Sequence, residues 1–147
     1  MNKTLPDKWV RKAVYDAING IVVDSMVIPC YDTHVTYSAQ NDEPNHYVLM
    51  TTQTNDVDKR NKCEWFYESS ILLDIITSYS GAGNNGSRLL VDNITDTCRN
   101  ALQDLTLDAA SGLDIVTETM NFPSDITTDV GAEIIFRKFI RLELTIK

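Results

Sequence analysis

The chain has 147 residues, 43% of them hydrophobic and 23% charged, which suits one domain with a single core and excludes a disordered or fibrous protein. Its 13 Lys and Arg face 21 Asp and Glu, a formal net charge of −8. Gripping nucleic acid through its phosphates requires clustered Lys and Arg, so this balance argues against that class of protein.

The sequence also argues against membrane insertion and secretion. No stretch approaches the about 18 consecutive apolar residues of a membrane-spanning helix, and the first residues lack the apolar region of a signal peptide. The three cysteines, Cys30, Cys63 and Cys98, are odd in number and far apart, which indicates free buried thiols. We therefore expect a protein made and kept in a reducing cytoplasm.

The first part of the chain predicts one helix followed by a connection. Apolar residues recur at helical spacing over residues 6–19, where Thr4 and Asp7 resemble a capping box and Asn19-Gly20 provides a helix end. Residues 21–31 are apolar but contain a proline, so they predict a loop with at most a short edge strand.

A hairpin is expected next. Residues 46–52 predict a strand, and the polar residues 55–61 predict an exposed hairpin tip. Residues 63–76 are rich in aromatic and branched side chains, which favours a long antiparallel return strand.

The second half repeats the order of helix and strands. Residues 87–104 predict a helix with Cys98 on its apolar face, residues 113–122 a strand and residues 123–131 a long turn. Residues 140–147 alternate strictly between apolar and polar, as in a strand with one buried face. The order predicts a single α+β domain over residues 1–147, in which two helices pack on one face of an antiparallel or mixed sheet of four to five strands.

One motif points to a nucleotide. Gly81, Gly83 and Gly86 match G-x-G-x-x-G between a predicted strand and a predicted helix. The flanking strands look like hairpin strands, whereas the dinucleotide fingerprint requires parallel strands, and too little chain remains for further βαβ units. A glycine-asparagine turn is the preferred interpretation, and nucleotide binding stays as a distant alternative.

The sequence gives little support for a metal site or a catalytic nucleophile. Cys30 and His34, with Cys63 brought near by the fold, form one candidate metal set, but the sequence has no C-x-x-C pair. The cysteines and the histidines His34 and His46 carry no local signature of a catalytic pair. We therefore expect no enzymatic activity, no metal and no cofactor.

The order and lengths of the elements resemble the tail terminator proteins of tailed bacteriophages, also called tail completion or head-to-tail joining proteins. The connection over residues 21–40 and the turn over residues 123–131 are longer than in that family. The segments that carry the resemblance are the helix 6–19, the strand entry 44–50, the polar hairpin tip, the strand 65–80, the helix 88–105 and the closing strand 136–144.

The resemblance implies a structural virion protein of the tail or neck, made in the cytoplasm of a bacterial host. Identical subunits would close into a ring, as a hexamer, that caps the tail tube and joins it to the head connector. DNA would pass through the acidic lumen without specific contacts, and no membrane would be involved. A stopper, an adaptor or a ring of a short-tailed phage remains the alternative.

Sheet edges and the hairpin over residues 52–62 are the candidate contacts between subunits, by adding strands or by docking on a neighbour. Successive side chains of a strand point to opposite faces, so at least one of three consecutive aromatics must lie outside the core of one subunit. Packing of these rings under the two helices is the alternative interpretation. The candidate interface residues are Asp56, Asp58, Lys59, Arg60, Trp65, Phe66 and Tyr67.

Overall fold

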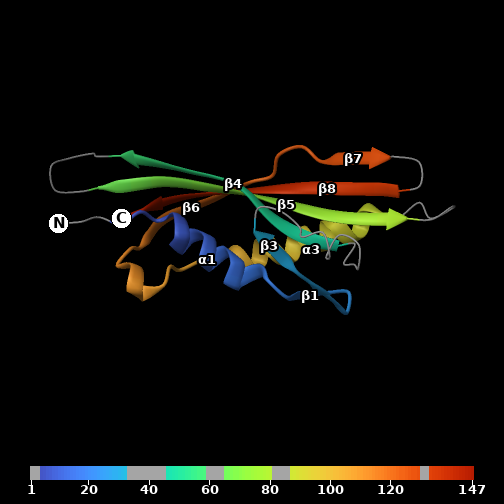
Figure 1. The fold of residues 1–147 in the computed structure, drawn as a ribbon, viewed down its shortest axis with the longest axis horizontal. Helices are drawn as coiled ribbons and strands as arrows, with labels where there is room; N and C mark the ends of the chain where they lie inside the picture. Colours follow the sequence, from blue (N-terminus) through green and yellow to red (C-terminus); the bar gives the residue numbers. More distant parts are fainter. Residues whose placement is uncertain (1–3, 33–45, 59–64, 81–86, 130–132) are drawn as a thin grey trace.

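The computed structural model describes residues 4–32, 46–58, 65–80, 87–129 and 133–147. Two α-helices lie on the same side of one large sheet of long strands (Figure 1). The sheet has six strands in the order β3-β4-β5-β8-β6, with β7 also paired to β8, and a separate two-stranded hairpin lies beside it. The α+β prediction is confirmed, with more strands than expected.

Helix α1 (Asp7–Ile18) buries Val10, Val14 and Ile18, which recur every four residues on one face. The predicted capping box is wrong, because Pro6 occupies the N-cap position and no side chain caps the helix. The predicted end is confirmed: the N–H of Asn19 donates to Tyr15 O at 2.8 Å, and the next residue is a glycine with a φ of 78°.

Residues 21–31 hold more structure than the sequence predicts. Strands β1 (Ile21–Val23) and β2 (Met26–Ile28) form a hairpin, and β3 (Cys30–Asp32) pairs in parallel with β4. Asp24 and Ser25 both adopt positive φ, as a two-residue hairpin turn requires, although neither is a glycine. The proline of this segment separates β2 from β3 instead of preventing strands, and β3 makes the sheet mixed.

Strands β4 (His46–Asp58) and β5 (Phe66–Ser80) form the long antiparallel hairpin that the sequence predicts. The expected hairpin tip at 55–61 is wrong for residues 55–58, which continue β4 and pair with residues 66–69 of β5. Polar side chains are compatible with a strand whose partner supplies the backbone hydrogen bonds. Residues 59–61 lie outside the described residues.

Helix α3 (Arg88–Leu102) follows the predicted boundaries closely. The Ser87 side chain caps it by accepting a hydrogen bond from Leu89 N at 3.1 Å. The buried face includes Cys98, which has no exposed surface, so its predicted core position is confirmed. A 3-10 turn, η1 (Ala109–Ser111), leads from this helix toward β6.

Strands β6 (Ile115–Asn121) and β7 (Ile126–Asp129) pair with the two halves of the closing strand β8 (Glu133–Ile146). The long turn predicted over residues 123–131 is therefore wrong for residues 126–129. These four residues are polar or exposed, so their pattern gives no strand signal, and it is the pairing with β8 that extends them.

The core lies between the helices and one face of the sheet, here called the near face. Alternate residues of β5 and β8 bury their side chains there, as period two requires. Gln53 marks the near face of β4, because its Nε2 donates to Asp7 O at 2.9 Å, and Lys138 marks that of β8, because its Nζ lies 2.8 Å from Asp92 of α3.

Candidate assembly interface

The described members of the predicted interface lie where β4 ends and β5 begins. Asp56 is exposed and lies opposite Glu68 of β5 in the strand register. Asp58, the last residue of β4, lies opposite Phe66. Lys59 and Arg60 lie outside the described residues. The structure thus places the described part of this set on one rigid two-stranded ribbon, and its role in subunit contacts stays a prediction.

The three consecutive aromatics separate as strand geometry requires. Tyr67 is 2% exposed and belongs to the core on the near face, paired across to Ile146. Phe66 points to the opposite side of the sheet and, like Trp65, is half-buried. The expectation that at least one aromatic lies outside the core is confirmed by Phe66 and Trp65, neither of which belongs to the buried cluster.

The sheet face turned away from the two helices, here called the far face, has an apolar half. Tyr31 and Tyr47 stack edge to face there with ring centroids 5.8 Å apart. Burial raises the pKa of Tyr47 above its usual value, so the phenol stays neutral at physiological pH. Leu49 and Phe139 lie on the same face, as cross-strand neighbours of Asp74 on either side. The helices do not cover this face (Figure 1).

A charged pair lies within this apolar half. Asp74 is 2% exposed, and Arg137 donates to both of its carboxylate oxygens, from Nε to Oδ1 at 3.3 Å and from Nη2 to Oδ2. The hydrogen bonds to Asp74 raise the pKa of Arg137 above its usual value. The guanidinium also lies 5.4 Å from the ring of Phe139 and keeps more than a third of its surface exposed. A partly hydrated cation is thus held in a fixed place on the far face.

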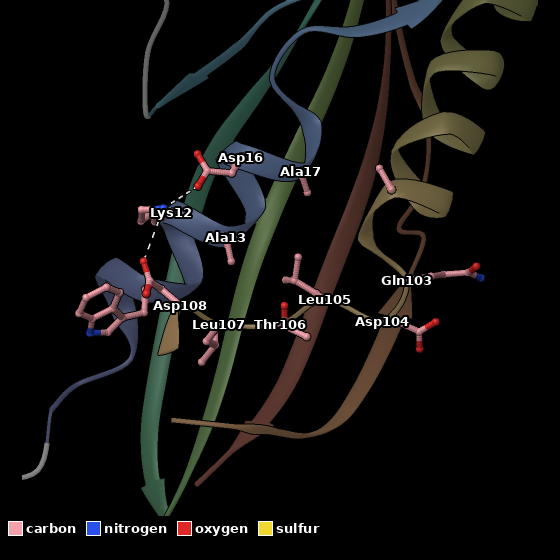
Figure 2. A pocket seen from close by; sticks show the side chains of 12 residues that line it. Lys12, Ala13, Asp16, Ala17, Gln103, Asp104, Leu105, Thr106, Leu107 and Asp108 are labelled. Carbon is pink, nitrogen blue, oxygen red and sulfur yellow. Dashed lines mark hydrogen bonds and ion pairs between the residues drawn. The ribbon is translucent and has the colours of Figure 1, made fainter. Parts of the chain in front are cut away.

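A groove of about 420 Å³ between α1 and the segment that follows α3 is shown in Figure 2. Lys12 bridges its two sides, with Nζ 2.7 Å from Asp16 and 3.9 Å from Asp108. The hydrogen bond that Lys12 donates to the Asp16 carboxylate raises the pKa of Lys12, which keeps the ammonium charged. One lysine between two carboxylates is most simply an ion-pair network that ties α1 to the segment after α3.

The thiols are poor candidates for chemistry. Burial raises the pKa of both Cys30 and Cys98 to about 12, so neither forms the thiolate that nucleophilic attack or metal binding needs. His34 and Cys63, the other members of the candidate metal set, lie outside the described residues. Within the described residues no group of three or more His, Cys, Asp and Glu side chains could hold a metal ion.

The glycine motif at 81–86 also lies outside the described residues, but the strand before it is described. β5 pairs antiparallel with β4 on one side and with β8 on the other. A dinucleotide fingerprint follows a strand with parallel neighbours, so the surroundings of this motif differ from those of a nucleotide-binding turn.

The sequence indicated a second sheet face, open to water or to a partner, but not the residues that form its apolar half. The one signal of that half is the unbroken run Ile71 to Ile76, in which residues of both parities are apolar around Asp74. A continuous apolar run is typical of a strand that is buried on both faces. The run does not indicate which other residues lie on the second face.

Fold and surface together define an α+β protein with a helix-covered near face and an apolar patch on the far face, and with no described constellation of catalytic groups. No family model matches the chain, and no curated protein matches it. The fold is similar to that of a chain in the virion of a native gene transfer agent particle, with a TM-score of 0.59 at 13% sequence identity. The match covers 95% of this chain and 96% of that one. Among the described helices, none is long and apolar enough to cross a membrane.

Proposed function

We propose that this protein is a structural component of a virion: a tail terminator whose copies form a hexameric ring between the tail tube and the head connector. The observation that carries the proposal is the likeness to a virion chain, because the match covers 95% of this chain and 96% of that one. At 13% identity that likeness concerns the fold, and the step from fold to role is our inference.

The surface supports a role through shape and self-association. An apolar half-sheet bearing two tyrosines and a phenylalanine is costly to leave in water and suits contact with another protein. The net charge of −8 suits a lumen through which DNA slides, because acidic side chains repel phosphates where basic ones would hold them.

The proposal includes the absence of enzymatic activity. Titration calorimetry with nicotinamide and adenine dinucleotides and with ATP is expected to give no heat of binding. An affinity that is present in the native chain and lost in Gly83→Val would instead favour the nucleotide-binding alternative.

The deciding experiment removes the gene from the producing strain and images the particles. A terminator blocks further subunit addition at the end of the tube, so its loss should give tails longer than the native length together with unattached heads. Tails of normal length beside heads that have lost their DNA would indicate a stopper or adaptor ring instead. Particles that keep their native shape and still infect or transduce cells would contradict any neck role. A reconstruction of the native particle would locate the ring directly.

A further inference from the structure

Among the described strands, two borders of the sheet have no paired neighbour, and both lie toward the same end of the strands. β3 covers only residues 48–50 of β4, so within the described part of the chain the remainder, residues 52–58, has no partner on its outer side. At the opposite border β6 pairs with β8 on one side, and no described strand pairs with the other. These two segments are called the β4 edge and the β6 edge.

The registers place the two edges at the same level. Each row of cross-strand neighbours begins on the β4 edge, crosses β5 and β8, and ends on the β6 edge. One such row is Thr54, Ser70, Glu143 and Thr119, and the row two residues further along is Asp56, Glu68, Thr145 and Thr117.

The strand directions match as well. β5 runs antiparallel to β4, β8 antiparallel to β5, and β6 antiparallel to β8. Three reversals leave β6 antiparallel to β4. A second copy placed beside the first in the same orientation therefore brings its β6 edge antiparallel to the β4 edge of the first, which is the pairing that already fills this half of the sheet.

The two edges lack part of the usual protection against pairing. Lys, Pro and β-bulges guard the edges of monomeric sheets, and neither residues 52–58 nor residues 115–121 contain a Lys or a Pro. A register shift lies at the start of each segment, between Met50 and Gln53 and between Ile115 and Thr117, and the register beyond it is regular. Exposed apolar side chains flank both edges: Leu5 and Val57 beside β4, at 57% and 49% exposure, and Val116 and Phe122 at the ends of β6, at 47% and 46%.

Each edge borders a groove on the near face. The groove at the β6 edge holds Asp104 and Glu118 beside the single cation Arg99. The groove at the β4 edge holds Asp7 beside Arg11, and Arg11 is itself paired with Asp32. The register, the strand directions and the exposed edges therefore support the pairing, and opposite charges do not.

We propose that the β4 edge of one copy pairs antiparallel with the β6 edge of the next, so that the sheet continues from subunit to subunit. Two different edges meet, which is a head-to-tail contact, and such a contact closes into a ring when its rotation permits. The inference rests on the proposed ring and names the surfaces that build it.

Disulfide trapping tests the pairing in the assembled protein. Thr54→Cys and Thr119→Cys are combined in one Cys63→Ser chain, because both threonines are exposed, lie on the far face and share a row. Oxidation should convert most chains into a ladder of covalent oligomers on a non-reducing gel, and reduction should collapse the ladder to one band. Purified rings or whole particles serve equally as the starting material.

A matched control combines Thr54→Cys with Thr128→Cys. Thr128 is level with Ser78, whereas Thr54 is level with Ser70, so the two positions lie eight residues or about 26 Å apart along the strands. This pair should give no ladder, because a disulfide needs Cα atoms within about 7 Å.

The outcomes separate the two proposals. Rings that form normally but give no ladder with Thr54→Cys and Thr119→Cys would overturn the edge pairing and leave the ring intact. Covalent dimers from Thr54→Cys alone would show that like edges meet, which also overturns it. A protein that stays monomeric in solution and is missing from particles would overturn the proposed function itself.

Discussion

Asp74 and Arg137, 63 positions apart in the chain, form a two-pronged ion pair between the neighbouring strands β5 and β8 on the far face. Asp74 is 2% exposed, so its carboxylate has lost nearly all of its contact with water. The hydrogen bonds and the charge of Arg137 offset most of that cost. The pair therefore fixes the relation of the two central strands and leaves one guanidinium edge facing outward.

Arg137→Met should destabilise the protein by about 1–3 kcal/mol, because it leaves a buried carboxylate without its cation. The lower half of that range reflects the partial exposure of Arg137. The double variant Asp74→Val with Arg137→Met should recover most of the loss, since neither charge then remains. Urea unfolding of the three variants measures the effect, and a double variant no more stable than Arg137→Met would contradict this account.

Ser87→Ala should destabilise the protein by about 1 kcal/mol, because the Ser87 hydroxyl accepts the hydrogen bond from Leu89 N at the start of α3. Ser87→Asp should retain the native stability, since a carboxylate also accepts that bond and suits a helix N-terminus. Thr4→Ala is the matched control at the first helix, where no side chain caps the end, and thermal unfolding should leave it unchanged. Equal losses at both positions would contradict the assignment.

Glu118 should make the stability depend on pH. Burial, with a smaller contribution from Asp104, raises the pKa of Glu118 in the folded state above its unfolded value. A carboxyl with a raised pKa favours folding while protonated and loses that contribution as the pH rises through its folded pKa. Glu118→Gln should therefore be more stable than the native chain at pH 7.

The advantage of Glu118→Gln should vanish as the pH falls below the unfolded pKa of glutamate, about 4.3, where the native side chain is itself protonated. Unfolding curves at pH 7 and pH 4 check this, with Asp114→Asn as an exposed control that should show no such change. A constant difference between the two pH values would contradict the role of the charge.

Cys30 and Cys98 should resist thiol reagents in the folded protein. Burial hides both sulfurs and raises the pKa of each to about 12, so at pH 8 the reactive thiolate is almost absent. In a Cys63→Ser chain, a colorimetric thiol assay should show no reaction until denaturant is added, and then two thiols per chain. Rapid labelling without denaturant would contradict the buried positions.

Local pattern was sufficient where one face of an element is buried and the other exposed. Helix α3 and the end of β8 follow their apolar periods closely, and the split of Phe66 from Tyr67 follows from period two alone. Residues 126–129 and the end of β4 were missed because their polar side chains carry no strand signal, and only pairing with β8 and β5 extends them.

The candidate interface also has a part that the sequence predicts and a part that it does not. The polar hairpin and its aromatics could be found from the sequence, because their unusual composition is local. The two edges could not, since the level of β4 relative to β6 depends on three successive registers that join residues as far apart as Thr54 and Thr119.

The sequence by itself determined an acidic α+β chain with two amphipathic helices and a long hairpin, because composition and period act between near neighbours. The tertiary structure decided which strand borders which, where the sheet ends, and that Arg137 reaches Asp74. Pairing of distant strands depends on the free energy of the whole packed sheet and not on any one segment, so no local pattern encodes it.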